Sequence, residues 1–175
     1  MKETTIGGEA EQRIRNSKKE IWQPAQNLEF NPALKDLSLL VGKWKMALSN
    51  ASFLNDPSAV IEGQASFQWV EGGACLVMRQ GKKPGDPFYA SWLISRDEKV
   101  DNYSISYFDS RGVSRIYEMS FKGNLWKIWR NSPGFSKRFE GKISDSGKSI
   151  IAHWEKSIDG RDWERDFDMK YTKIK

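Results

Sequence analysis

The stretch from Tyr103 to Arg130 constrains the fold of this chain more than any other part of the sequence. It has the pattern of three short strands separated by two tight turns. In the first turn, residues 109–112, Asp stands at the first position of a type I turn and Gly where a left-handed residue is needed, which predicts a three-residue hairpin loop closed by a glycine bulge. The second turn, residues 123–124, is Gly-Asn and predicts a two-residue loop. The two loop lengths set the register of three consecutive strands.

The two registers, derived independently, place the same large side chains on one face of the sheet. Tyr107 is expected opposite Arg115, Met119 opposite Ile128, and Tyr117 opposite Arg130. The other face carries Glu118 and several serines. We therefore predict that the face rich in aromatic residues is the interior of a closed or strongly curved sheet.

Strand and turn patterns continue at short spacing from residue 42 to residue 174, with no connection long enough for a parallel crossover. Asn31 and Pro32 have the pattern of an N-cap followed by proline at the first helical position, and apolar residues recur at helical spacing up to residue 41. The predicted fold class is all-β: an antiparallel up-and-down β-barrel of about ten strands, with a short N-terminal helix that plugs one end.

The first part of the chain, residues 1–30, is polar and contains only a weak helical pattern. We predict an N-terminal arm, partly flexible or weakly helical, followed by one β-barrel domain over residues 31–175. An alternative remains open, in which Ile14, Ile21 and Trp22 dock a helix onto the barrel or onto a second subunit. The sequence is therefore compatible with a monomer and with a homodimer.

The facing of the last three strands depends on the turns at residues 146–147 and 159–160. Two-residue loops at both turns would bury Trp154 and leave His153 outside, whereas glycine bulges would turn His153 and Glu155 inward. We favour the two-residue loops, because Asp-Gly at residues 159–160 is a strong hairpin signal.

Few side chains are available for catalysis. In the favoured register Trp154 pairs with Arg165, and the acidic residues of the last strand, Asp166 among them, alternate onto the solvent face, so a buried acid pair is not expected there. His153 is the only histidine and Cys75 the only cysteine. No catalytic triad can form without His153, and multi-histidine metal sites and internal disulfides are excluded. The sequence favours a non-enzymatic function without excluding catalysis, and we expect no metal.

The charge pattern argues against a nucleic-acid partner. The formal net charge is +5, but basic and acidic residues are interspersed, and neither a recognition helix nor an aromatic sheet signature is present. No apolar run approaches the roughly 20 residues that span a bilayer, and the N-terminus lacks the apolar core of a secretory signal. We expect a cytoplasmic protein without a membrane span.

The candidate site is the aromatic inner face. A buried arginine is costly unless something satisfies its charge, which favours a small hydrophobic or amphipathic, anionic ligand held by guanidinium and phenol groups against an apolar wall. The alternative, which remains open, is an internal network with Glu62, Glu71, Asp109 or water. The predicted ligand-binding residues are Tyr107, Arg115, Tyr117, Arg130, Trp69, Trp92, Trp126 and Met119.

The sequence resembles a known superfamily of ligand-binding barrels. A short helix running into Gly42-Lys43-Trp44, followed by a meander of strands, is similar to the calycin superfamily of lipocalins and fatty-acid-binding proteins. Over residues 35–173 the chain is more similar to a family of bacterial lipocalin-like proteins, through residues 67–73, 107–115, 133–139 and 163–168. The resemblance implies a barrel with a central cavity and no particular activity. The Arg-x-Tyr of fatty-acid-binding proteins does not match the last strand here, although Arg115-Ile116-Tyr117 occurs in a middle strand.

The resemblance also suggests one cofactor. Barrels of the nitrobindin branch hold haem through a single histidine late in the chain, and His153 lies late in this chain, although the residues around it match no motif of that branch. The main expectation is a carrier or sensor of a small ligand with no cofactor. The alternatives are an enzyme that acts on such a ligand inside the cavity, a haem-binding barrel, and a domain that works through its outer surface.

Overall fold

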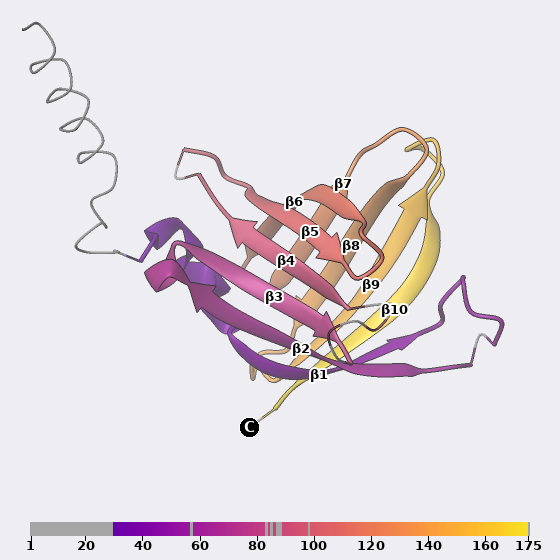
Figure 1. Cartoon of the computed structure of the whole chain (residues 1–175), viewed down its shortest axis with the longest axis horizontal. Helices are drawn as coiled ribbons and strands as arrows, with labels where there is room; N and C mark the ends of the chain where they lie inside the picture. Colours follow the sequence, from indigo (N-terminus) through magenta and orange to yellow (C-terminus); the bar gives the residue numbers. More distant parts are fainter. Residues whose placement is uncertain are drawn as a thin grey trace, which may run out of the picture.

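The computed structural model describes residues 30–174, apart from residues 57, 83, 85, 87, 88 and 98. Within this part of the chain, ten strands form one closed barrel, in which each strand is antiparallel to its neighbours in sequence and the last strand pairs with the first (Figure 1). The predicted all-β barrel is confirmed. The predicted arm, residues 1–30, lies outside the described residues except for Phe30. The strands are β1 (Gly42–Ser49), β2 (Ile61–Val70), β3 (Cys75–Gly81), β4 (Ala90–Ser95), β5 (Tyr103–Asp109), β6 (Ser114–Lys122), β7 (Leu125–Arg130), β8 (Ser136–Ile143), β9 (Ser149–Ser157) and β10 (Glu164–Lys173).

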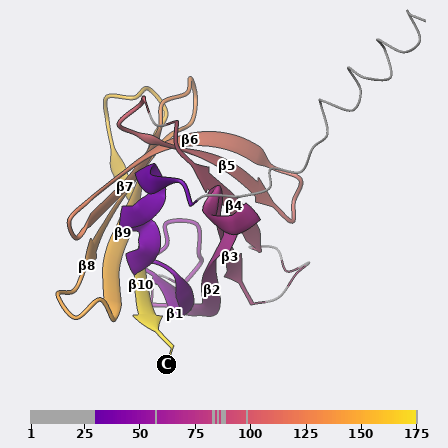
Figure 2. The ribbon, with the colours of Figure 1, turned by 90° about the vertical axis from the view of Figure 1, so that its left-hand side faces the viewer.

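The predicted short helix is present as the 3-10 helix η1 (Pro32–Leu39), and the three-residue helix η2 (Glu71–Gly73) joins β2 to β3. The Asn31 side chain caps η1 by accepting a hydrogen bond of 3.0 Å from the backbone N–H of Ala33. The buried leucines 34, 37 and 40 are spaced by three, which is the period of a 3-10 helix, so they share one side. Figure 2 shows η1 lying across one opening of the barrel. No helix in the described part of the chain is long and apolar enough to cross a membrane.

The predicted register of the central strands is confirmed, although the β6–β7 ladder ends at Glu118 and Trp129, one step before the predicted pair of Tyr117 and Arg130. Tyr107 lies opposite Arg115 in the β5–β6 ladder, and Met119 lies opposite Ile128 in the β6–β7 ladder. The first hairpin closes through the backbone N–H of Asp109, which donates to the carbonyl of Val113 at 3.1 Å. The turn inside this hairpin needs glycine at residue 112, where φ is +79°.

The last hairpin differs from the prediction in one respect. Trp154 lies opposite Phe167 and not opposite Arg165, because the β9–β10 ladder shifts between Arg165 and Phe167. A bulge places two residues of β10 opposite one of β9 and breaks the alternation of side chains. Asp166, expected on the solvent face, is therefore buried at 5% exposure. The favoured facing of β9 itself is correct, since Trp154 is buried and His153 lies on the alternate face, opposite Glu140 and Asp168.

The barrel interior is packed at the end covered by η1. Trp44 donates its indole N–H to the Leu40 carbonyl at 2.8 Å and ties β1 to η1. Deeper in the same half, the Trp126 ring contacts Phe67 at 5.9 Å and Phe139 at 4.8 Å between centroids. These fully or almost fully buried rings fill this half of the barrel.

Candidate functional site

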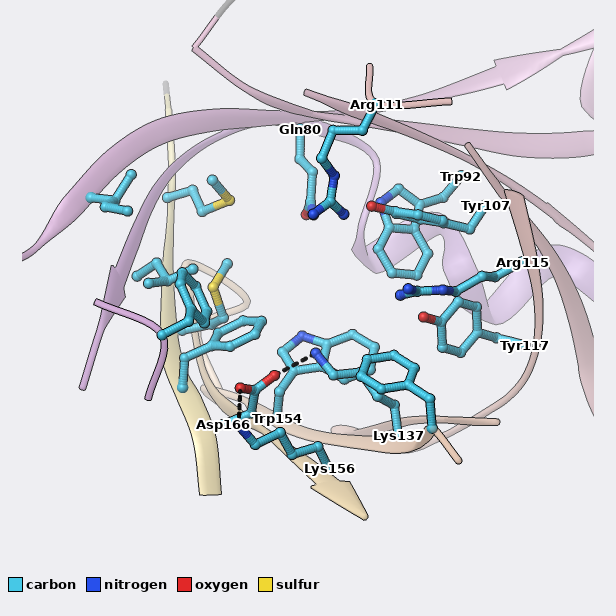
Figure 3. A pocket seen from close by; sticks show the side chains of 17 residues that line it. Gln80, Trp92, Tyr107, Arg111, Arg115, Tyr117, Lys137, Trp154, Lys156 and Asp166 are labelled. Carbon is cyan, nitrogen blue, oxygen red and sulfur yellow. Dashed lines mark ion pairs between the residues drawn. The ribbon is translucent and has the colours of Figure 1, made fainter. Parts of the chain in front are cut away.

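A cavity of about 540 Å³ occupies the half of the barrel that lies away from η1. This volume is within the range of about 300–1,000 Å³ that is usual for small-molecule sites. Its lining comes from the ends of the strands opposite η1 and from the loops that connect them (Figure 3). The lining residues are Met46, Leu48, Phe53, Ile61, Gln80, Trp92, Tyr107, Arg111, Arg115, Tyr117, Phe135, Lys137, Trp154, Lys156, Asp166, Phe167 and Met169.

One wall of the cavity is aliphatic. It consists of Met46 and Leu48 on β1, Ile61 on β2 and Met169 on β10. Leu48 pairs with Ile61 on one side and with Met169 on the other, so these three side chains form a continuous row. The row presents no charged group, and it is suited to hydrocarbon.

The opposite wall is aromatic and cationic. In the ring of ten strands β6 lies five places from β1 in either direction, so the two strands face each other across the barrel. Trp92, Tyr107 and Arg115 form one cross-strand row over β4, β5 and β6. The Tyr117 ring lies 5.6 Å from the Trp92 ring and 6.1 Å from the Trp154 ring. Figure 3 shows Arg115 and these rings directed into the same space.

Arg111, which enters from the β5–β6 turn, is neutralised by Asp109. The Arg111 guanidinium lies 2.6 Å from the Asp109 carboxylate, which also accepts a hydrogen bond of 2.8 Å from the Tyr107 hydroxyl. Burial alone would raise the pKa of Asp109, but hydrogen bonds from Arg111, Tyr107 and two backbone N–H groups hold it well below its ordinary value. Burial raises the pKa of Tyr107, and the neighbouring carboxylate raises it further. Tyr107 therefore stays protonated and Asp109 stays ionised at neutral pH.

Two lysines share a second carboxylate. Lys137 and Lys156 are cross-strand partners on β8 and β9, and their ammonium groups lie 2.5 Å and 3.6 Å from Asp166. Burial lowers the pKa of Lys137, although Asp166 opposes this shift. Burial also disfavours the charged form of Asp166, yet the hydrogen bond and charge of Lys137, with smaller contributions from Ser52 and Lys156, hold its pKa below the ordinary range. Asp166 is therefore an ionised counterion inside the cavity.

Within the described part of the chain, Arg115 has no such counterion. Among the described residues, no carboxylate lies within 4.0 Å of its guanidinium, which instead lies over the Phe135 ring at 4.5 Å from the centroid. A half-buried cavity guanidinium without a carboxylate partner among the described residues is chemically suited to an anion. It stands on the wall opposite the aliphatic row.

The structure brings together half of the residues predicted for ligand binding. Trp92, Tyr107, Arg115 and Tyr117 line the cavity. Their role in binding remains a prediction. The other four predicted residues, Trp69, Met119, Trp126 and Arg130, are not part of the lining.

The four residues outside the lining lie at other positions in the barrel. Met119 and Trp126 are buried in the packed half. Trp69 lies at the η2 end, where its ring contacts Phe30 at 4.8 Å. The Arg130 guanidinium donates to the Phe135 carbonyl at 2.8 Å. Alternation along a strand gives the face of a residue but not its height along the barrel axis, which explains why all eight looked equivalent.

Sequence reasoning missed four charged lining residues: Arg111, which lies in the β5–β6 turn where alternation gives no facing, and Lys137, Lys156 and Asp166. Lys137 has the same parity on β8 as the inward Phe139, and Lys156 the same parity on β9 as Trp154, so alternation could have found both. Asp166 had no comparable signal, because it faces inward only through the bulge.

The described residues do not fit the haem alternative. His153 is the only histidine of the chain, and it lies on the face that alternates with the buried residues Ala152 and Trp154, outside the cavity lining. No group of three His, Cys, Asp or Glu side chains within the described part of the chain is arranged to hold a metal ion.

Fold and cavity together define a closed antiparallel β-barrel that is packed at one end and hollow at the other. No known family model matches the sequence, and no curated protein matches it. Among solved structures, the chain is similar to Rv2717c from M. tuberculosis, with 13% sequence identity and a TM-score of 0.55 over 84% of this chain and 100% of the other. At this level of identity the similarity supports the barrel fold alone, and the calycin resemblance remains a prediction.

Proposed function

We propose that this protein binds a small amphipathic anion in the barrel cavity, as a carrier or sensor. The observation that carries the proposal is the position of Arg115, a cavity arginine without a carboxylate partner among the described residues, on the wall opposite the aliphatic row of Leu48, Ile61 and Met169. An acidic head group at Arg115 directs the rest of the ligand across the cavity towards this row.

The two walls supply different parts of the binding free energy. A hydrogen bond to a charged group contributes about 1.5–3 kcal/mol. Hydrocarbon that leaves water for the aliphatic wall contributes roughly 25 cal/mol per Å² of apolar surface. The rings of Trp92, Tyr117 and Trp154 add a flat surface beside the arginine. The ligand class that uses all three features has an apolar body and one acidic group.

A matched pair of fluorescent probes tests the proposal. Anilinonaphthalene sulfonate carries an acidic group, and N-phenylnaphthylamine has nearly the same aromatic body without it. We expect the sulfonate to bind about ten- to a hundredfold more tightly, which corresponds to one charge-assisted contact. Equal affinities for the two probes would contradict the proposal.

Native mass spectrometry of freshly purified protein complements the probes. A copurified acidic amphiphile would identify the natural ligand class. The same spectra, recorded over time after the addition of a candidate ligand, distinguish a carrier from an enzyme, because a carrier returns the ligand chemically unchanged.

A further inference from the structure

Among the described residues, Asp166 is the one carboxylate that lines the cavity. It is 5% exposed, and the bulge in β10 directs it inward. Besides the contacts with Lys137 and Lys156, it accepts a hydrogen bond of 2.9 Å from the Ser52 hydroxyl, while the Ser52 backbone N–H donates to its carbonyl at 2.8 Å. A carboxylate that is paired with cations inside the cavity neutralises positive charge that would otherwise be available to a ligand.

We propose that Asp166 sets the charge selectivity of the cavity. It pairs with Lys137, while Lys156 is shared between Asp166 at 3.6 Å and Glu164 at 3.5 Å. Among the described cations of the lining, Arg115 is then the one left for the ligand, and the cavity prefers anions with one negative charge to anions with two. The inference rests on the proposed function and narrows its ligand class to carboxylates and sulfonates, with phosphate monoesters disfavoured.

Two cations of the cavity lie beside the same ring. The Arg115 guanidinium lies 4.5 Å and the Lys137 ammonium 5.7 Å from the centroid of Phe135. Without Asp166, both charges would be available to an anion above that ring, and a doubly charged head group would gain most from two cations.

With Asp166 in place, a singly charged head group is favoured over a doubly charged one. The carboxylate already lies 2.5 Å from Lys137, so a second negative charge on the ligand would approach an existing one in a poorly solvated site. Arg111 offers no alternative, because Asp109 already pairs with it at 2.6 Å. A ligand with one charge meets Arg115 without this repulsion.

The test compares naphthoate with naphthyl phosphate, which share an aromatic body and differ in head-group charge. Affinities are measured by calorimetry at about pH 8, above the second phosphate pKa of about 6. The wild-type protein should bind naphthoate at least tenfold more tightly. In Asp166→Asn, which retains shape and can still accept a hydrogen bond from Ser52, the preference should shift at least tenfold towards naphthyl phosphate. Adding Lys137→Met to this variant should reverse most of the shift, because Lys137 is the released cation beside Arg115, whereas Lys156 still lies 3.5 Å from Glu164.

The outcomes separate this inference from the proposed function. If Asp166→Asn folds, binds naphthoate through Arg115 and shows the wild-type preference, charge selection by Asp166 is wrong and the proposed function stands. If naphthoate does not bind the wild-type protein, and Arg115→Met changes nothing, the proposed function itself is wrong. Circular dichroism verifies the fold of each variant. Asp166→Ser is a second neutral replacement, for which the same shift is expected should Asp166→Asn not fold.

Discussion

Phe167 on β10 lies opposite Trp154 on β9. An unbroken ladder continuing from the pair of Arg165 and Glu155 would place Asp166 opposite Trp154 instead. The extra residue is Asp166. The bulge keeps the Phe167 ring 6.2 Å from the Trp154 ring and at the same time directs a carboxylate to Lys137. The consecutive side chains of Asp166 and Phe167 therefore both face inward, which strict alternation along a strand would not allow.

Arg115→Met should weaken the binding of anilinonaphthalene sulfonate while the fold persists. The loss of one charge-assisted contact lowers affinity by about ten- to a hundredfold. Since no described carboxylate is left unpaired, the free energy of unfolding should change by only about 1 kcal/mol, the value of an arginine over an aromatic ring. Fluorescence titration and urea unfolding of the same preparation measure both quantities.

Arg130→Met is the matched control for that variant. Arg130 is an inner-face arginine by sequence, but its guanidinium donates to the Phe135 carbonyl and it does not line the cavity. We expect the affinity for the sulfonate probe to change by less than about threefold, which is well below one charge-assisted contact. A tenfold loss in Arg130→Met with no loss in Arg115→Met would move the anion site to the β7–β8 end and contradict the assignment.

Asp166→Asn should destabilise the protein, and Lys137→Met should compensate. The two side chains are 6% and 12% exposed, so removing the carboxylate leaves a buried ammonium at a cost of about 3–5 kcal/mol. Methionine has a similar volume and an apolar end that suits the surrounding rings of Trp154 and Phe167. The double variant should therefore recover most of the loss in chemical denaturation. Simple addition of the two single losses would show that the pair is not coupled.

The stability of the wild-type protein should fall in acid partly through Asp166. Its pKa in the folded protein is lower than the value of about 3.9 expected for an unfolded chain. The ionised carboxylate thus contributes stability that is fully present above about pH 4 and is lost as the pH falls through the lower folded pKa. Asp166→Asn should therefore show a shallower acid decline in its urea midpoint. Parallel declines in both proteins would contradict this assignment.

Gly112→Ala should destabilise the β5–β6 hairpin through the backbone alone. Residue 112 has φ of +79°, and a Cβ atom built there would meet nothing within 4 Å, so crowding makes no contribution. The left-handed conformation costs a residue with a side chain about 1–2 kcal/mol. Gly112→Asn is the control, because asparagine adopts this conformation more readily, and it should lose less stability in thermal unfolding. Equal losses for both variants would indicate a different cause.

Much of the fold could be predicted from the amino-acid sequence. Turn chemistry at residues 109–112 and 123–124 predicted the pairing of Tyr107 with Arg115 and of Met119 with Ile128, and both pairs are present. These predictions succeed because a short loop allows few registers, and because a register in turn sets the face of every side chain on both strands. The barrel follows from repeating this local rule around the chain.

The site could be derived only in part. Face assignment found Tyr107 and Arg115, but it ranked Trp126 and Arg130 equally with them, although Trp126 packs the closed half and Arg130 binds a backbone carbonyl. Alternation has a period of two residues and contains no information about height along the barrel axis, which is set by how neighbouring strands are staggered.

By itself, the sequence determined the strand order, the central registers and the division of side chains between inside and outside, because these depend on neighbours along the chain. Only the tertiary structure decided which end is packed by Trp44 and Trp126, and which of the two lining arginines has no carboxylate partner among the described residues. The inward position of Asp166 was likewise decided by the tertiary structure. A bulge arises when two strands pair over their whole length, and an ion pair such as Lys137 with Asp166 requires β8 and β10 to meet across β9. These relationships join residues far apart in sequence, and so only the closed barrel defines them.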